Sequence, residues 1–264
     1  MDKAIIEYVC TNAFLGEPIY ISSNLGAIKC PKICDLHGDF IYYVSNAIYY
    51  CNLYDENSDK FLYYLLERTN KDKNNEPLIL DFTKFAFKFY DADNFSFLLE
   101  NNLSIIFKKN VIEKIDDEKG EKKDVIKENI IGVIDSSNIS LFMDILKTIH
   151  FLKNDDYLDE EDENESKIAK EMKARIREER KKLQKTNSQK DNIGLLDVLS
   201  AVTARHPSIN PLNVDQLNYY QVMQEFNQLM KIDNWNVNMM ALTNGNISKE
   251  GQQNIKHYIS HADD

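Results

Sequence analysis

The chain is poor in the residues and motifs that mark catalytic or extracellular proteins. Only 8 of its 264 residues are glycine, and no Gly-rich segment is placed to form a phosphate-binding loop. It has no Gly-x-Ser-x-Gly segment, which excludes the nucleophile turn of the α/β-hydrolases. Its 4 cysteines are too few for a disulfide scaffold, so reduced thiols are expected. We therefore expect neither an enzyme nor a bound cofactor.

Long apolar runs and an excess of basic residues are also missing. No stretch of about twenty apolar residues occurs, so no membrane span is expected. Asp2 and Glu7 interrupt the segment where a signal peptide would be apolar, which argues against secretion. The net charge of −11 disfavours a nucleic-acid partner, because phosphate binding needs a basic surface.

Residues 1–153 show the patterns of an α+β domain that is mostly helical. Residues 17–30 predict a first β-hairpin, with Asn24 and Gly26 in its turn. Helical spacing of apolar residues follows around 40–51, 61–66, 80–89 and from 93 onwards. Tyrosine doublets such as Tyr42–Tyr43 on these helices predict that one ring faces the core and its neighbour faces outwards.

A second hairpin is expected between the extended runs 103–107 and 126–134, which flank a charged loop with Gly120 at its tip. The sequence Asp135–Asn138 then offers a helix N-cap before an apolar stripe that continues to Ile149. The predicted fold is therefore an N-terminal helical domain with two small β-hairpins, followed by a charged linker and a helical C-terminal region.

The remainder of the chain reads as that linker and helical region. Residues 154–166 are too acidic and too poor in apolar residues to pack, which predicts a linker. Residues 167–264 follow as the helical C-terminal region, with a basic helix at 167–185 and a helical bundle at 192–262. The basic helix has one narrow apolar stripe, which is enough to dock on a partner but not to build a core.

The best-defined helix of the bundle is expected to begin at Asn213, with Gln216 completing a capping box. Its buried stripe would run to Met230. A polar break is expected at Asp233–Asn234, before a second apolar segment that begins at Trp235, and Gly245 would end that segment.

Candidate metal ligands are sparse. Cys30 and Cys34, with His37 three residues later, lack the second ligand pair that a closed zinc site requires. Buried structural cysteines are the favoured interpretation, and no metal site is expected. His257 and His261 are four residues apart, but they lack the Glu of a metalloprotease helix. For His206, beside Pro207, a structural role in a turn is favoured over catalysis.

One segment carries a family resemblance. Residues 200–214, Ser-Ala-Val-Thr-Ala-Arg-His-Pro-Ser-Ile-Asn-Pro-Leu-Asn-Val, continue into Leu217–Val222 and Phe226. Together they resemble the tail assembly chaperones of long-tailed bacteriophages that infect Gram-positive hosts. Residues 16–19, 30–33 and 133–139 also look similar to that family, so the resemblance touches both halves of the chain.

The resemblance implies a non-enzymatic role in tail morphogenesis. Such chaperones bind the long apolar tape-measure protein and keep it soluble while tail-tube subunits polymerise around it. By this resemblance, residues 1–153 would match a domain shared by a short and a frameshift-extended form, and 167–264 the extension. The implied location is the host bacterial cytoplasm, and self-association is an open option. The alternative is a structural virion protein, such as a neck or baseplate adaptor, which would be located in the virion.

The partner-binding residues predicted from these patterns fall into two groups. Three arginines lie on the basic helix, and the others are apolar or aromatic residues of the bundle, where methionines repack at little cost. They are Arg175, Arg177, Arg180, Tyr220, Phe226, Met230, Trp235, Met239 and Met240.

Charge reversal at Arg175, Arg177 and Arg180 tests the first group. We expect the triple Arg→Glu variant to weaken a protein–protein contact, measured by pull-down of co-expressed tail proteins, because the basic helix is assigned to a protein partner. A gel shift in which the variant loses binding to RNA would contradict that assignment.

Overall fold

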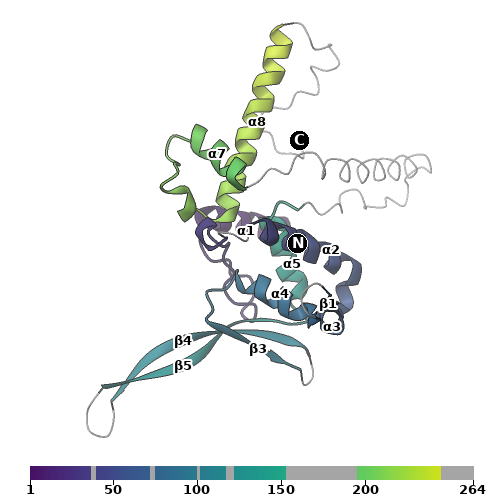
Figure 1. The fold of residues 1–264 in the computed structure, drawn as a ribbon, viewed down its shortest axis with the longest axis vertical. Helices are drawn as coiled ribbons and strands as arrows, with labels where there is room; N and C mark the ends of the chain where they lie inside the picture. The colour runs from purple at the N-terminus through teal and green to yellow at the C-terminus, as the bar shows by residue number, and fades with distance from the viewer. Residues whose placement is uncertain (37–39, 72–74, 100–101, 117–121, 153–194, 245–264) are drawn as a thin grey trace, which may run out of the picture.

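The computed structural model describes residues 1–36, 40–71, 75–99, 102–116, 122–152 and 195–244. Figure 1 shows a helical body with an antiparallel sheet at one end and a long helix projecting from the other. The expected mostly helical α+β fold is confirmed.

The body is built from helices that pack above the sheet. Its helices are α1 (Lys3–Leu15), α2 (Phe40–Asn57), α3 (Phe61–Glu67), α4 (Leu78–Phe87) and α5 (Ile139–Ile149), with short 3₁₀ turns at Ile33–Leu36 and Ser58–Lys60. The strands are β1 (Thr69–Asn70), β2 (Glu76–Pro77), β3 (Asn94–Leu98), β4 (Ser104–Asp116) and β5 (Lys122–Ile134). The C-terminal part contributes α7 (Leu195–Arg205), a 3₁₀ turn at Val214–Gln216, and α8 (Tyr219–Thr243).

Aromatic rings fill the core between α2, α4 and α5. Phe82 lies edge-on to Phe142 of α5 and to Tyr50 of α2, with ring centroids 6.2 and 5.1 Å apart. Such edge-to-face pairs stabilise a core beyond the area that they bury. The doublet prediction is confirmed on α2: Tyr43 and Tyr50 are buried, whereas Tyr42 and Tyr49 are exposed.

The sheet has the order β3-β4-β5 and is antiparallel throughout. The predicted hairpin between 103–107 and 126–134 is confirmed as β4–β5, although both strands are longer than expected. Gly132 lets Tyr90 stack on Phe107 at 4.2 Å, because a Cβ at this position would lie 2.5 Å from the Tyr90 ring. Beside it, Gly26 has a φ of +76° and lies against the backbone of Ile131.

Two expectations for the N-terminal part are corrected. The helix predicted from residue 93 is wrong, because residues 94–98 form β3 and pair with β4 through Phe95↔Phe107. Polar and aromatic residues alternate over Asn94–Phe97, as expected for a strand. The neighbouring strand β4 provides the hydrogen-bonding partner. The hairpin expected at 17–30 is reduced to one antiparallel bridge, Ile19↔Ile28. The second small sheet is instead β1–β2, at the polar loop around residues 70–75.

The start of α8 differs from the prediction. The backbone N–H of Asn218 donates to Oε1 of Gln221 at 2.8 Å, and the N–H of Gln221 donates to Oδ1 of Asn218 at 2.8 Å. This is a capping box. It lies five residues after the predicted pair, because Asn213 and Gln216 belong to a separate 3₁₀ turn. The side chain of Asn213 instead bonds to Asn210 and Ser208.

The polar break expected at Asp233–Asn234 is also wrong, since α8 runs without interruption from Tyr219 to Thr243. Neither residue is a helix breaker like proline or glycine. In addition, the Asp233 carboxylate forms an ion pair with Arg205 at the end of α7, which places it on the side of α8 that faces α7. Within the described part of the chain, no helix is long and apolar enough to cross a bilayer.

The first turn of α8 is built into the N-terminal body. Asn218 forms a β-bridge with Lys32, and its side-chain amide donates to the Ala13 carbonyl at the end of α1, at 2.7 Å. The amide of Gln221 donates to Phe14 O at 2.7 Å. Tyr219 and Tyr220 are both buried in the main core. The two halves of the chain therefore meet directly.

Several predicted features lie outside the described residues. These are the acidic linker 154–166, the basic helix 167–185 with Arg175, Arg177 and Arg180, the Gly245 cap, and His37, His257 and His261.

Replacing Asn218 with alanine tests the junction. The variant loses a helix cap and the shorter of the two hydrogen bonds to the Ala13 carbonyl, so the free energy of unfolding should fall by about 1–3 kcal/mol. Chemical denaturation measures this change, and Asn236→Ala on the exposed distal part of α8 is the matched control. Equal stability of the two variants would contradict the assigned junction.

Candidate functional site

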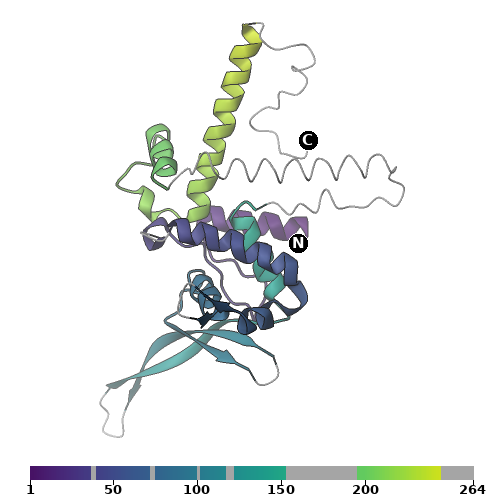
Figure 2. The same ribbon diagram turned by 45° about the vertical axis from the view of Figure 1, so that its right-hand side comes forward.

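An exposed apolar surface lies on the distal half of α8. Val222, Phe226, Met230 and Val237 follow one another at spacings of four, four and seven residues, so they share one side of the helix. Val222 is buried and Phe226 half-buried, whereas Met230 is 45% exposed and Val237 64% exposed. The stripe that fixes α8 to the body therefore continues as an open surface where the helix leaves the body (Figures 1 and 2).

Met240, which is 64% exposed, lies three residues after Val237 and belongs to the same side of the helix. A second group of apolar side chains lies on other sides of the segment, where Ile232 is exposed and Trp235 and Met239 are half-buried. A helix that is apolar on more than one side is normally covered by other chains or elements. We call residues 230–243 of α8 the distal rod.

The predicted partner-binding residues divide between the two ends of α8. Tyr220 is buried, and its ring stacks on Phe151 at 4.9 Å. Phe226 packs against a small cluster that joins α7, α8 and Ile33. These two residues hold α8 on the body. The structure places Met230, Trp235, Met239 and Met240 together on the distal rod.

The turn between α7 and α8 is held by its own polar side chains. Nδ1 of His206 accepts from the backbone N–H groups of Ser208 and Ile209, at 3.2 Å each. Further along the turn, the side chain of Asn210 accepts from the backbone N–H of Leu212. The side chain of Asn213 accepts from the N–H of Asn210 and donates to the Ser208 carbonyl. His206 therefore has a structural role in this turn, and the segment that carries the family resemblance positions α8.

Sequence reasoning missed a second exposed apolar surface, on the face of the β3-β4-β5 sheet that points away from the helices. We call it the outer sheet face. Its residues are Leu98, Ile106, Ile112, Ile126, Ile130 and Val133. The available signal was the pairing of two isoleucine-rich runs, but only the register shows that these side chains share one face.

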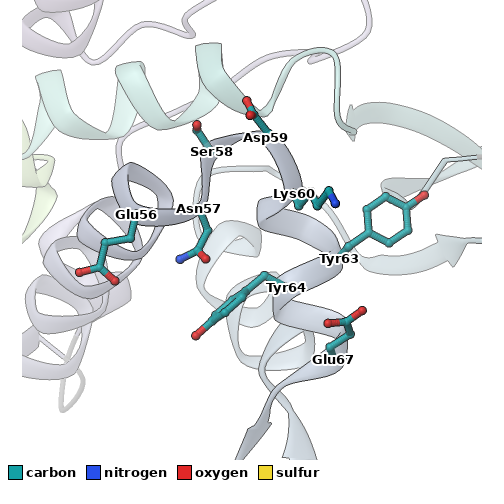
Figure 3. A pocket seen from close by; sticks show the side chains of 8 residues that line it. All are labelled: Glu56, Asn57, Ser58, Asp59, Lys60, Tyr63, Tyr64 and Glu67. Carbon is teal, nitrogen blue, oxygen red and sulfur yellow. The ribbon is translucent and has the colours of Figure 1, made fainter.

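A shallow recess lies where α2 meets α3. Its volume is about 390 Å³, and its rim carries Glu56, Asp59, Lys60 and Glu67 together with two tyrosines. Figure 3 shows the carboxylates of Glu56, Asp59 and Glu67 pointing in different directions. General acid–base chemistry needs titratable groups that converge on one point. This recess does not provide them.

His150 is a buried titratable residue whose neighbours are aromatic rings and a backbone carbonyl. It packs against the rings of Tyr43 and Tyr219, with ring centroids 5.1 and 5.0 Å away, and its Nδ1 is 2.7 Å from the Leu146 carbonyl. Burial lowers the pKa of His150 to about 4, so the ring is neutral at pH 7.

Of the four cysteines, Cys51 is buried, and Cys10, Cys30 and Cys34 are intermediate. Burial raises the pKa of the Cys30 thiol to about 12, which keeps it protonated. Among the described residues, no three His, Cys, Asp or Glu side chains are grouped to hold a metal ion.

Comparison with protein families finds a match in the C-terminal part of the chain. Residues 185–263 match the model of the YomV second domain, and this stretch includes α7, the turn and α8. YomV is a protein of a Bacillus phage region, so the match fits a phage protein. No curated protein and no solved structure matches the chain.

The depressed pKa of His150 gives a stability prediction. The ordinary pKa of 6.5 applies in the unfolded chain, so the unfolded state binds the proton more tightly. Stability should therefore fall as the pH drops from about 6.5 to about 4, by about 3 kcal/mol from this group. Urea unfolding across that range measures the loss.

His150→Phe is the matched control, since it retains an aromatic ring without a titrating group. Its stability should depend less on pH in this window, while surface carboxylates contribute equally to both proteins. Identical pH profiles for the variant and the natural chain would contradict the assigned role of His150.

Proposed function

We propose that this chain is a non-enzymatic assembly chaperone of phage tails, which binds helical segments of the tape-measure and tail-tube proteins. The observation that carries the proposal is the distal rod, where Met230, Val237 and Met240 continue the anchoring stripe of α8 and are 45%, 64% and 64% exposed. An apolar helix face is a common docking site for another amphipathic helix.

The chemistry of the distal rod suits clients of varied sequence. Between residues 230 and 243 the only charged residues are Lys231 and Asp233, and Asp233 is paired with Arg205. Met230, Met239 and Met240 supply flexible side chains that repack against different partners. The net charge of −11 on the whole chain would help to keep a complex with an apolar client in solution.

The phage-associated family match supports this proposal, because it includes the whole of α8. The match supports the phage context. The choice of tape-measure and tail-tube clients rests on the resemblance of residues 200–226 to tail assembly chaperones.

A structural virion protein, such as a neck or baseplate adaptor, is the second candidate. It is favoured by the distal part of β4–β5, which extends beyond the body as a two-stranded arm (Figure 1). Arms of this kind fit contacts between neighbouring subunits of an ordered particle. Mass spectrometry of purified virions separates the two candidates, because a chaperone should be absent from finished particles and an adaptor present in stoichiometric amount.

Substitutions on the distal rod test the chaperone proposal. We expect the double variant Val237→Lys, Met240→Lys to lose most of its ability to solubilise the co-expressed tape-measure protein, because two exposed apolar contacts become charged. Its melting temperature should change little, since both side chains are exposed. Solubility of the tape-measure protein after co-expression provides the measurement.

Two further variants serve as controls. Asn236→Lys and Asn238→Lys change exposed polar positions of the same helix segment and should retain activity. Full solubilisation by the Val237→Lys, Met240→Lys variant would exclude the distal rod as the client site. Phe226→Asp should instead lower the melting temperature, because Phe226 packs into the cluster that holds α7 and α8 together.

A further inference from the structure

Both faces of the β3-β4-β5 sheet carry apolar side chains, although helices cover only one of them. The inner face carries Ile105, Phe107 and Ile134, which are fully buried against the helices. An antiparallel sheet with one covered face normally presents polar side chains on the other. Here the outer sheet face carries exposed aliphatic side chains beside polar ones: Ile112, Ile126 and Ile130 are 64%, 69% and 62% exposed, and the ion pair of Lys108 and Glu128 lies among them.

The register of β4 and β5 places these side chains on one surface. Ile112 lies directly opposite Ile126, and Ile130 lies opposite Lys108 on the same face. Nearer the body, Ile106 lies opposite Val133, and Leu98 continues the surface on β3. In Figures 1 and 2 the helices lie on the other side of the sheet, and no described element covers this one.

The outer half of the hairpin has little support from the rest of the described structure. β3 pairs with β4 only over residues 104–108, so residues 109–116 and 122–130 form a two-stranded ribbon. An isolated ribbon is at best marginally stable in water, because it buries too little apolar surface. Packing of a second sheet on its apolar face would supply the missing burial.

The charge of the arm identifies the kind of partner. Between residues 108 and 128, seven lysines and seven acidic residues cancel, although the whole chain has a net charge of −11. The described charges alternate in sign across the strands: Lys108 pairs with Glu128 at 3.1 Å, and Lys127 with Glu113 at 3.5 Å. A strongly basic or acidic partner would find no complementary net charge here, whereas a second copy of the same neutral arm meets no net repulsion from it.

We propose that the outer sheet face is the interface between two copies of this chain. The two sheets pack face to face about a two-fold axis, so that the same isoleucines of each copy contact one another. The neutral arm lets two acidic chains approach without the repulsion that other surfaces would impose. This inference is independent of the proposed chaperone function, because it uses the opposite end of the molecule from the distal rod.

Analytical ultracentrifugation of the full chain tests the proposal. We expect the natural chain to sediment as a dimer at micromolar concentration, and Ile112→Lys, Ile126→Lys to raise the dimer dissociation constant on the order of 100-fold. Circular dichroism checks that the variant is folded. Val111→Lys is the matched control, because Val111 is adjacent in β4 but points to the opposite face.

Each outcome decides the proposal. A monomeric natural chain, or a variant that dimerises as tightly as the natural chain, would overturn it. Equal weakening by Val111→Lys would also overturn it, since the contact would then not be specific to the outer sheet face. Dimerisation that is lost only in the Ile112→Lys, Ile126→Lys variant supports it, and the conservative change Ile126→Val should then retain the dimer.

Discussion

The arrangement of this molecule depends on how α8 begins. Asn218 occupies the centre of that junction: its backbone pairs with Lys32, its Oδ1 caps the helix, and its amide donates to the last turn of α1. One buried residue therefore forms a β-bridge, a helix cap and a hydrogen bond to α1. Its polar groups are all paired, which matters because unpaired polar groups are costly in a buried position. Tyr219 and Tyr220 add aromatic packing on both sides of the cap. The direction of α8 is fixed at this point.

This junction explains why the distal rod is exposed at all. A free helix would bury an apolar stripe by lying along the body, but the cap and the bridge set the axis of α8 before the stripe reaches Met230. α7 accompanies only part of the helix, through the Val198 cluster and the pair between Arg205 and Asp233. Beyond these contacts, Val237 and Met240 continue the same helical pattern and remain exposed. The exposure is therefore a consequence of a rigid attachment.

The sequence predicted those elements whose apolar spacing is strong and local. α2, α4 and α5 follow from their stripes, and the β4–β5 hairpin follows from two extended runs around a charged loop. The helix predicted at β3 failed because Phe95, Leu98 and Leu99 lie at helical spacing, whereas Phe95 and Phe97 alternate as in a strand. The choice between the two depends on pairing with β4.

The capping box was misplaced for a related reason. Asn213 and Asn218 are both followed by a glutamine after three residues, and only contacts with α1 and Lys32 distinguish them. Of the predicted partner-binding residues, the four from Met230 to Met240 lie together on the distal rod. The outer sheet face could not be predicted from composition, because only the pairing register of β4 and β5 shows which side chains share a face.

The two apolar surfaces lie at opposite ends of the molecule, and this separation constrains how they can be used (Figure 2). If two copies meet through the outer sheet face, their α8 helices point away from the contact and both distal rods remain open. One binding event therefore does not block the other. A dimer would present two helical docking sites, and a long client that reached both would bind more tightly than either site alone allows. Because the arm is neutral while the chain is acidic, salt should strengthen the contact between copies by screening the remaining repulsion.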